Sequence, residues 1–352
     1  MNKYISPRMA AMKEYVPNTD VYKIRLDANE SPFLPDAETR KKIAEAVSSV
    51  SFNRYPDPLA AEAVKKYAAY IDVSPDLITP GNGSDELINV IIQGFFSAGD
   101  KLYITPPDFS MYEFYAQLKE LSVVSFDRPD GMYKIPCDEL IADVNVKKPR
   151  AVMFSNPCNP LGQAYSRDEI IKLTKSVQAL CIIDEAYMDF YGDTVVRDVE
   201  SFDNLIVLRT ASKAAGFAAA RLGFAVTNKE LTSVIRKVKS PFNVNSLTQA
   251  AACVMLSDAK KLRSVTETIV NERKYLESKL KDVCPNGGFE LIPTVSNFAL
   301  MRGKNAVKVF EALKKEGIAI RCLAGEYLRV TAGSRDENDE FLAAFKKVLK
   351  EI

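Results

Sequence analysis

One lysine stands in an almost wholly apolar part of the chain. Residues 205–226 read LIVLRTASKAAGFAAARLGFAV, and in that run only Arg209, Lys213 and Arg221 carry charge. Burying an unpaired ammonium group is costly. Lys213 therefore either lies on an exposed turn and reaches water, or uses its amine in a covalent bond to a carbonyl compound. Arg209 is expected to be structural.

The residue types that are missing from the chain restrict its chemistry. The 352 residues include no histidine, which excludes a histidine-containing catalytic triad, a histidine zinc site and a histidine general base. Proton transfer would then fall to lysine, tyrosine or a carboxyl group, or to a cofactor. The six cysteines have no paired spacing, which predicts reduced thiols and no metal site.

The charge and hydropathy of the chain exclude two kinds of partner. The formal net charge is +1, with acidic and basic residues interleaved, so no electrostatic footprint for nucleic acid or an anionic membrane is present. No apolar run approaches the roughly 20 residues that a membrane-spanning helix needs. The N-terminus MNKYISPRMAAMKEYVP has no signal-peptide pattern. We expect a cytoplasmic protein that acts on small molecules.

Short β-branched runs alternate with amphipathic stretches in the centre of the chain, which predicts a mainly parallel sheet wrapped by helices. The predicted helices span 84–96, 109–121 and 166–178. The last predicted strand follows its neighbour after a short alanine-rich segment, which is compatible with an antiparallel pairing. The predicted strands are 101–105, 122–126, 151–155, 180–184, 205–209 and 222–226.

A second region with its own alternation of helices and strands follows residue 245. It opens with a long helical stretch over 246–283 and ends with a helix whose start is marked by the Ser-Arg-Asp-Glu sequence at 334–337. These patterns predict a large domain over 29–245. Residues 1–28 and 246–352 would form a smaller α+β domain with an N-terminal arm.

Polar groups follow the predicted strands, where ligands bind in open α/β sheets. The sequence GNGSDE at 81–86 opens a helix and is either a simple turn or an anion-binding nest. It matches neither a Walker A nor a GxGxxG motif. The strand ends supply four phosphate donors, an aromatic plate, an amide, a carboxylate, a phenol and one amine: Ser84, Thr210, Ser212, Arg221, Phe109, Asn159, Asp184, Tyr187 and Lys213. Pyridoxal phosphate needs such a set, because it has an aldehyde, a pyridine nitrogen and a phosphate.

The motifs, taken in order, resemble those of fold-type I pyridoxal-phosphate-dependent aminotransferases. The family motifs are GNGSDE, PPDFSMY, NPCNPLG, DEAY, RTASKAAGFAAARLGF and YLRVTAG, and they extend over nearly the whole chain. LDANESP at 26–32 and RYPDP at 54–58 are similar to the motifs of histidinol-phosphate aminotransferases. The resemblance implies a mainly parallel, seven-stranded sheet in the large domain and a smaller α+β domain.

The resemblance also assigns roles to the candidate residues. Lys213 would form the Schiff base with the cofactor and move the proton, and Asp184 would pair with the pyridine nitrogen. Tyr187 and Asn159 would bind the ring oxygen, and Phe109 would stack on the ring. The phosphate would be held by the amides of Ser84 and Asp85 and by the side chains of Thr210, Ser212 and Arg221. Tyr55 of RYPDP would reach the partner's cofactor phosphate across a homodimer interface.

The predicted substrate contacts are Tyr15, Asn159, Arg321 and Arg329. Two guanidinium groups fit a phosphate dianion and also a dicarboxylate such as glutamate, the expected amino donor. Two features depart from the family pattern: Leu161 stands where threonine is usual, and the segment between Arg321 and Arg329 is short. The resemblance implies histidinol-phosphate:2-oxoglutarate transamination in histidine biosynthesis.

Three alternatives to histidinol-phosphate transamination stay open. The chain could be an aminotransferase for aromatic or other amino acids. It could be a threonine-phosphate decarboxylase, whose substrate also carries a phosphate. It could also be a pyridoxal-phosphate-binding regulator without turnover, although no DNA-binding segment precedes the domain and the lysine, carboxylate and phenol of the site are all present.

Overall fold

A computed structural model describes residues 2–12, 14 and 20–352 of the chain. Its largest sheet has seven strands in the order β2-β8-β7-β6-β5-β3-β4. The strands are β2 (Ile78–Gly81), β3 (Lys101–Ile104), β4 (Ser122–Ser125), β5 (Ala151–Ser155), β6 (Leu180–Asp184), β7 (Leu205–Thr210) and β8 (Gly223–Thr227). Strands β4, β3, β5, β6 and β7 run parallel, and β8 is antiparallel to both β7 and β2. The predicted mainly parallel sheet is therefore confirmed, as is the antiparallel pairing of its last predicted strand.

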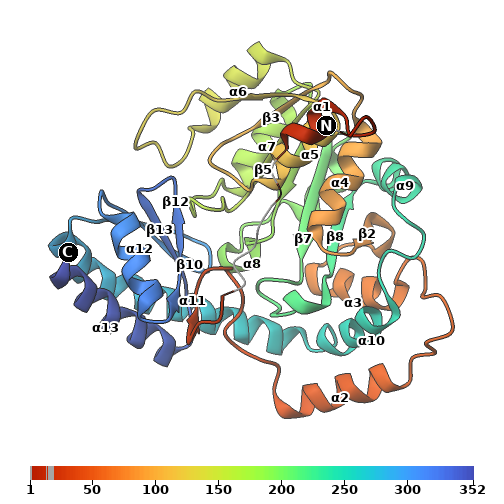
Figure 1. The fold of residues 1–352 in the computed structure, drawn as a ribbon. Helices are drawn as coiled ribbons and strands as arrows, with labels where there is room; N and C mark the ends of the chain where they lie inside the picture. The colour runs from red at the N-terminus through yellow and green to blue at the C-terminus, as the bar shows by residue number, and fades with distance from the viewer. Residues whose placement is uncertain (1, 13, 15–19) are drawn as a thin grey trace.

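Helices cover both faces of this sheet and bury the apolar side chains of its strands (Figure 1). One face packs against α3 (Ala61–Ile71), α6 (Cys137–Lys147), α7 (Arg167–Ser176) and α10 (Ser246–Met255). The other face packs against α4 (Ser84–Phe95), α5 (Met111–Leu118) and α9 (Lys229–Val238). Strands β5 and β7 are buried at every residue. Such continuous apolar runs are expected of parallel strands that are covered on both faces.

A smaller antiparallel sheet with the order β12-β13-β10-β9 forms the second apolar core with the C-terminal helices. Its strands are β9 (Glu290–Ile292), β10 (Phe298–Arg302), β12 (Arg321–Leu323) and β13 (Tyr327–Thr331). The helices are α11 (Ala259–Val283), α12 (Ala306–Lys315) and α13 (Arg335–Glu351). Near the N-terminus, β1 (Ile24–Arg25) pairs in parallel with β11 (Ile318–Ala319), so residues 24–26 join this core.

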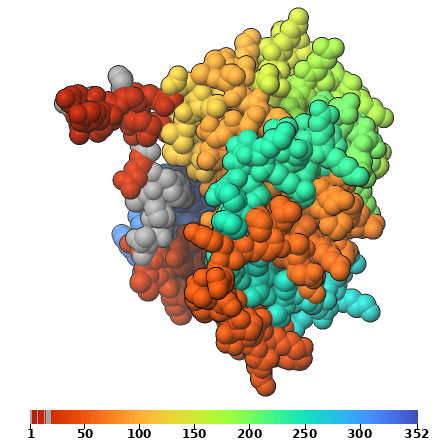
Figure 2. Space-filling view, turned by 90° about the vertical axis from the view of Figure 1, so that its right-hand side faces the viewer, coloured from red at the N-terminus to blue at the C-terminus, as the bar shows by residue number. Residues whose placement is uncertain are grey.

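The remaining helices are short or peripheral. They are α1 (Pro7–Ala11), α2 (Ala37–Ser48) and α8 (Met188–Tyr191). None of the side chains of α2 is buried, and this helix lies at the edge of the molecule beside α10 (Figure 1). In the space-filling view the red N-terminal residues project from the body (Figure 2). Among the described residues, no helix combines the length and the apolar character that crossing a bilayer requires.

Two boundaries show how side chains end and begin helices. The helical stretch expected over 246–283 is divided into α10 and α11, because the Asp258 carboxylate accepts the backbone N–H of Lys261 and starts a new helix. Helix α13 begins as predicted: Ser334 accepts the N–H of Glu337, and the Glu337 carboxylate accepts the N–H of Ser334.

Candidate active site

The carboxylate of Asp184 lies at the carboxyl end of the central strand β6 and is 4% exposed. Its Oδ2 accepts the Tyr112 hydroxyl at 2.8 Å, and its Oδ1 accepts the backbone N–H of Ala186 at 3.1 Å. Burial raises the pKa of this carboxyl from 3.8 to about 6, although both hydrogen bonds and the nearby Lys213 oppose the increase. The group is thus ionised at neutral pH at a cost to the fold, and it can hold a cationic ligand atom.

We expect Asp184→Asn to stabilise the cofactor-free protein above about pH 6. A carboxyl whose pKa is higher in the folded chain than the unfolded value of 3.8 binds more protons when folded, so its ionisation lowers the free energy of unfolding as the pH rises from 3.8 to about 6. The loss is complete above that range, and it amounts to about 2–3 kcal/mol. Thermal unfolding at several pH values checks this. A variant that is equally destabilised at every pH would contradict it.

Lys213 lies on the turn after β7 and is half-buried. Its Nζ donates to the backbone carbonyl of Ala28 at 2.8 Å and stands 5.7 Å from the centre of the Tyr187 ring. None of the salt bridges between described residues includes it. The lysine is therefore on a turn, and its amine lies beside the candidate residue Tyr187.

A cup suited to an anion is formed where α4 begins. Gly83 has φ of +85°, and an added Cβ there would be 2.8 Å from Nη2 of Arg221. A Cβ on Gly223 would come within 2.2 Å of the Ser84 backbone nitrogen, so only glycine allows this approach. The first N–H groups of α4, which begins at Ser84 and continues with Asp85, have no partners within the helix.

Side chains from β7 and the following turn complete this cup. Arg221 has φ of +54° and its Nη1 lies 3.5 Å from the Ser212 hydroxyl. The Ser212 N–H donates to the Thr210 hydroxyl at 3.1 Å. The structure thus brings together the predicted phosphate-binding set. Asp85 accepts a hydrogen bond from Tyr115, and burial raises the pKa of its carboxyl.

Arg329 on β13 connects the two sheets near Asn159. Its Nη1 donates to Asn159 Oδ1 at 2.5 Å and its Nη2 donates to the carbonyl of Asp27 at 2.8 Å, and the residue is 8% exposed. In the β12–β13 ladder Arg321 is directly opposite Arg329. Residues opposite each other in an antiparallel pair project from the same face. The structure therefore places the two predicted substrate arginines side by side.

Two departures from the family pattern have a visible structural setting. Leu161 is 2% exposed and packs with Ile292 and Leu300, so it fastens the loop after β5 to the smaller sheet. The short segment between Arg321 and Arg329 is a hairpin in which Ala324 and Gly325 have φ of +49° and +75°.

Three predicted site residues remain to be placed: Phe109, Tyr55 and Tyr15. Phe109 is partly buried and packs edge-on against Tyr112, with ring centres 5.6 Å apart. Tyr55 is 82% exposed and stacks on Phe242 with ring centres 4.6 Å apart. No recorded contact within the described chain joins Tyr55 to the other candidates. Tyr15 lies outside the described residues.

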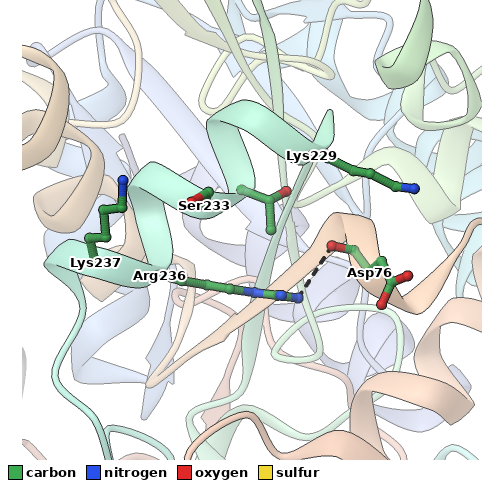
Figure 3. Close-up of a pocket in the computed structure, with 6 residues that line it drawn as sticks. Asp76, Lys229, Ser233, Arg236 and Lys237 are labelled. Carbon is green, nitrogen blue, oxygen red and sulfur yellow. Dashed lines mark hydrogen bonds between the residues drawn. The ribbon is translucent and has the colours of Figure 1, made fainter.

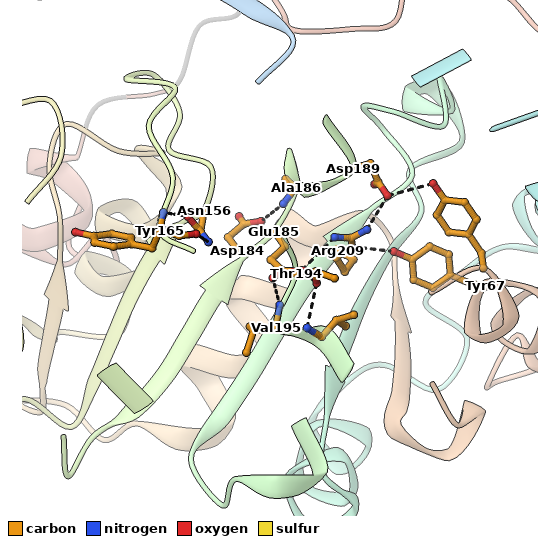
Figure 4. A network of polar contacts seen from close by, with 12 residues as sticks. Tyr67, Asn156, Tyr165, Asp184, Glu185, Ala186, Asp189, Thr194, Val195 and Arg209 are labelled. Carbon is orange, nitrogen blue, oxygen red and sulfur yellow. Dashed lines mark hydrogen bonds and ion pairs between the residues drawn. The ribbon is translucent and has the colours of Figure 1, made fainter. Parts of the chain in front are cut away.

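Arg209 has the structural role that its sequence context suggested (Figure 4). Its guanidinium donates to Glu185 at 3.1 Å, to Asp189 at 2.7 Å and to the Tyr67 hydroxyl at 3.2 Å. This buried network ties β7 to the residues that follow Asp184. The sequence contained a signal for it, namely an acidic residue after one buried strand and a basic residue at the end of the next.

Three residues near the site were not assigned a role from the sequence. Tyr112 binds Asp184, and Asn29 donates to the Tyr187 hydroxyl at 2.9 Å. Asp108 accepts the backbone N–H of Ser155 at 3.1 Å and bonds to its hydroxyl, while the Ser155 oxygen accepts the N–H of Asn159 at 2.9 Å. Asp108 therefore positions the loop that presents Asn159.

A hollow of about 450 Å³ lies on α9, and none of the candidate residues lines it (Figure 3). Its lining includes Lys229, Lys237 and Arg236, but the Arg236 guanidinium donates to the carbonyls of Asp76 and Ile78 and is occupied by the fold. The described residues contain no cluster of acidic or cysteine side chains that could hold a metal ion. The site at the strand ends is thus the better candidate for chemistry.

Comparisons with known proteins agree along nearly the whole chain. Residues 21–345 match the family model described as aminotransferase class I and II. A histidinol-phosphate aminotransferase of Clostridium novyi is 40% identical over 338 residues, which cover 95% of this chain and 94% of that protein.

Two solved structures share the fold. One is a histidinol-phosphate aminotransferase of Sinorhizobium meliloti in complex with pyridoxal-5'-phosphate; its TM-score is 0.88 at 22% identity, with 99% of this chain and 98% of that one covered. The other is the histidinol-phosphate aminotransferase of Clostridium acetobutylicum, with a TM-score of 0.83 at 26% identity, covering 94% of this chain and all of that one. Both sheets and the helices around them therefore belong to one known fold.

Proposed function

The chain belongs to the class I and II aminotransferase family, and from that premise we propose that it transfers an amino group from glutamate to imidazole-acetol phosphate. The products are 2-oxoglutarate and histidinol phosphate, and the cofactor is pyridoxal phosphate. The six cysteines are free thiols, which supports a reducing compartment such as the cytoplasm.

The residues at the strand ends fit pyridoxal phosphate. The cup at Ser84 depends on two glycines, because a Cβ on Gly83 would meet Arg221 and one on Gly223 would meet the Ser84 backbone, and Arg221 supplies a positive charge there. The ionised Asp184 carboxylate matches a protonated ring nitrogen. When bound, the cofactor supplies an aldehyde for the amine and a ring that withdraws electrons from the substrate's α-carbon.

The other groups of the site bind, orient and move protons. The Lys213 amine can take a proton from the substrate's amine-bearing carbon and deliver it to the cofactor carbon that carried the aldehyde, in a chain without histidine. Tyr187 and Asn159 offer a hydroxyl and an amide to the ring oxygen. Phe109 supports a ring face. Arg329 ties the position of Asn159 to that of the substrate anion.

The paired arginines on β12 and β13 are the observation that supports a phosphate-bearing substrate most strongly. Like charges directly opposite each other destabilise an antiparallel pair. Arg321 and Arg329 nevertheless occupy such a position, with Arg329 almost fully buried. A dianion between them would accept hydrogen bonds from both guanidinium groups. Glutamate's second carboxylate would use the same pair in the other half of the reaction.

The test of this function is spectral and needs no coupled assay. Purified protein loaded with pyridoxal phosphate is mixed separately with histidinol phosphate, phenylalanine and threonine phosphate. Rapid conversion of the cofactor to its amine form by histidinol phosphate is expected. Preferential conversion by phenylalanine would make the chain an aromatic aminotransferase, and carbon dioxide release from threonine phosphate would make it a decarboxylase. No change with any amine would favour a regulator.

We also propose that the protein is a homodimer with shared sites. Tyr55 and Phe242, which stack on each other, are both exposed, and Phe52, Leu59 and Leu247 are exposed on the same two segments. These two segments are neighbours, since Tyr55 stacks on Phe242 and Gln249 donates to the Asp57 carbonyl. Apolar groups exposed together mark a contact surface, and the family resemblance places Tyr55 near the phosphate of the partner's cofactor.

Subunit mixing should reveal shared sites. Lys213→Ala lacks the reactive amine in its own site, whereas Tyr55→Ala damages the site of its partner. Mixed dimers of the two variants are expected to regain one intact site each, so activity should exceed that of either variant alone. Activity that stays at the average of the two parents after mixing would contradict sharing, and a monomer by light scattering would contradict the dimer.

A further inference from the structure

Three backbone and side-chain groups in residues 27–29 bind three different candidate residues. The Asp27 carbonyl accepts Arg329 at 2.8 Å, and the Ala28 carbonyl accepts Lys213 Nζ at 2.8 Å. Asn29 uses its side chain instead, with Nδ2 donating to the Tyr187 hydroxyl oxygen at 2.9 Å. Asn29 is 1% exposed and has φ of +53°, a conformation that favours asparagine, aspartate and glycine.

Thr331 is the second hydrogen-bond partner of the Asn29 side chain. The Asn29 backbone N–H donates to the Thr331 hydroxyl oxygen at 3.0 Å, so that oxygen acts as an acceptor there. The single hydroxyl proton of Thr331 is donated to Asn29 Oδ1 at 3.2 Å. In this arrangement the amide oxygen faces Thr331 and the amide nitrogen faces Tyr187. Asn297 holds the Asn29 carbonyl at 3.1 Å from the other side.

The contact with Asn29 determines how the Tyr187 hydroxyl can form hydrogen bonds. The Asn29 amide nitrogen is only a donor, so the Tyr187 oxygen accepts at that contact. Its own proton is left for a different acceptor, and the ring is 4% exposed beside the Lys213 amine. We propose that Asn29 is a positioning residue that keeps the Tyr187 hydroxyl as a hydrogen-bond donor to the bound cofactor's ring oxygen. This rests on the proposed pyridoxal-phosphate function but not on the identity of the substrate.

Strand β13 carries residues that affect both the substrate anion and the Tyr187 hydroxyl. Arg329 and Thr331 are two residues apart on β13 and project from the same face. Arg329 binds Asn159, while Thr331 orients Asn29 and through it Tyr187. Strand β13 therefore positions both predicted ligands of the ring oxygen, Asn159 and Tyr187. The same strand carries Arg329, which is expected to bind the substrate anion.

Asn29→Asp is the variant that separates this role from simple packing. It keeps the shape and tolerates the backbone conformation, but its carboxylate accepts where the amide donated, so the Tyr187 proton is drawn to residue 29. The loaded protein changes colour with pH as the lysine-bound cofactor gains a proton. Loss of the donor to the ring oxygen is expected to move that transition upward by about one pH unit and to weaken cofactor binding about tenfold. Asn29→Gly fits the same φ and should give a smaller shift.

Two comparisons control for the added charge. Asn297→Asp places a carboxylate in the same buried region without a bond to Tyr187, so it should move the transition less than Asn29→Asp. In a Tyr187→Phe background, Asn29→Asp should lose the part of its shift that depends on the phenol. An equal shift with and without the phenol would overturn the proposal, as would no shift in Asn29→Asp. Wild-type protein that binds no cofactor would instead refute the proposed function.

Discussion

Replacing Lys213 by alanine is expected to reduce transamination by at least about 10³-fold, because one group then disappears from both cofactor attachment and proton transfer. The chain has no histidine to take over the proton. In the structure the amine donates to the Ala28 carbonyl and lies over the Tyr187 ring. A carbonyl cannot act as a base at neutral pH. The loaded variant should also lose the absorbance of lysine-bound cofactor.

The measurement that checks this role directly is chemical. Borohydride reduction of the loaded wild-type protein should attach the cofactor permanently to the peptide that contains Lys213, as read by mass spectrometry. Lys134→Ala is a matched control, since Lys134 is also half-buried but pairs with Glu169 at 2.8 Å and lies outside the candidate set. Attachment at another lysine, or unchanged turnover in Lys213→Ala, would contradict the assignment.

The parts of the site that were predictable from the sequence are those that follow strands. Asp184, Thr210 and Lys213 come directly after or at the end of apolar runs, and a parallel sheet collects such positions at one edge. The family resemblance then supplied their roles. Each of these inferences needs only local patterns and the rule that strand ends converge.

The supporting residues could not be predicted in this way, because their partners are distant in the chain. Asn29 was visible in the motif LDANESP, but its orientation depends on Thr331, which is 302 residues away. Tyr112 binds Asp184 across 72 residues. Such contacts are set by how two sheets and a helix layer pack together, and no periodicity in the sequence encodes them.

The elements of the fold also divide into those set by local sequence patterns, which were predictable, and those set by distant contacts, which were not. The six predicted strands are present with ends that differ by at most one residue, since long apolar runs specify buried strands. Strand β2 was not predicted. It has four residues, Ile78–Gly81, including proline and glycine, and it forms at the sheet edge because β8 pairs with it. The break between α10 and α11 likewise depends on one capping carboxylate.

Substitution of Arg321 or Arg329 is expected to have the second large effect on the kinetics. Arg321→Met is expected to raise the KM for histidinol phosphate about 10²-fold with a small change in kcat, because the anion loses one charged donor that acts equally before and during the reaction. Arg329→Met should lower kcat/KM by about 10³-fold, since it removes the other donor and also releases Asn159 and the Asp27 carbonyl. Steady-state kinetics with both substrates separates the two patterns.

Arg302→Met provides the matched control for these variants. Arg302 lies on β10 in the same small sheet, but its charge is already neutralised by Asp130 at 2.7 Å and Glu326 at 2.9 Å. Its loss should leave KM within about twofold, because the partners of an exposed or half-exposed ion pair are well solvated. An equal rise of KM in Arg302→Met would mean that the sheet was disturbed. A fall of kcat without a change of KM in Arg321→Met would show that this arginine does not hold the substrate anion.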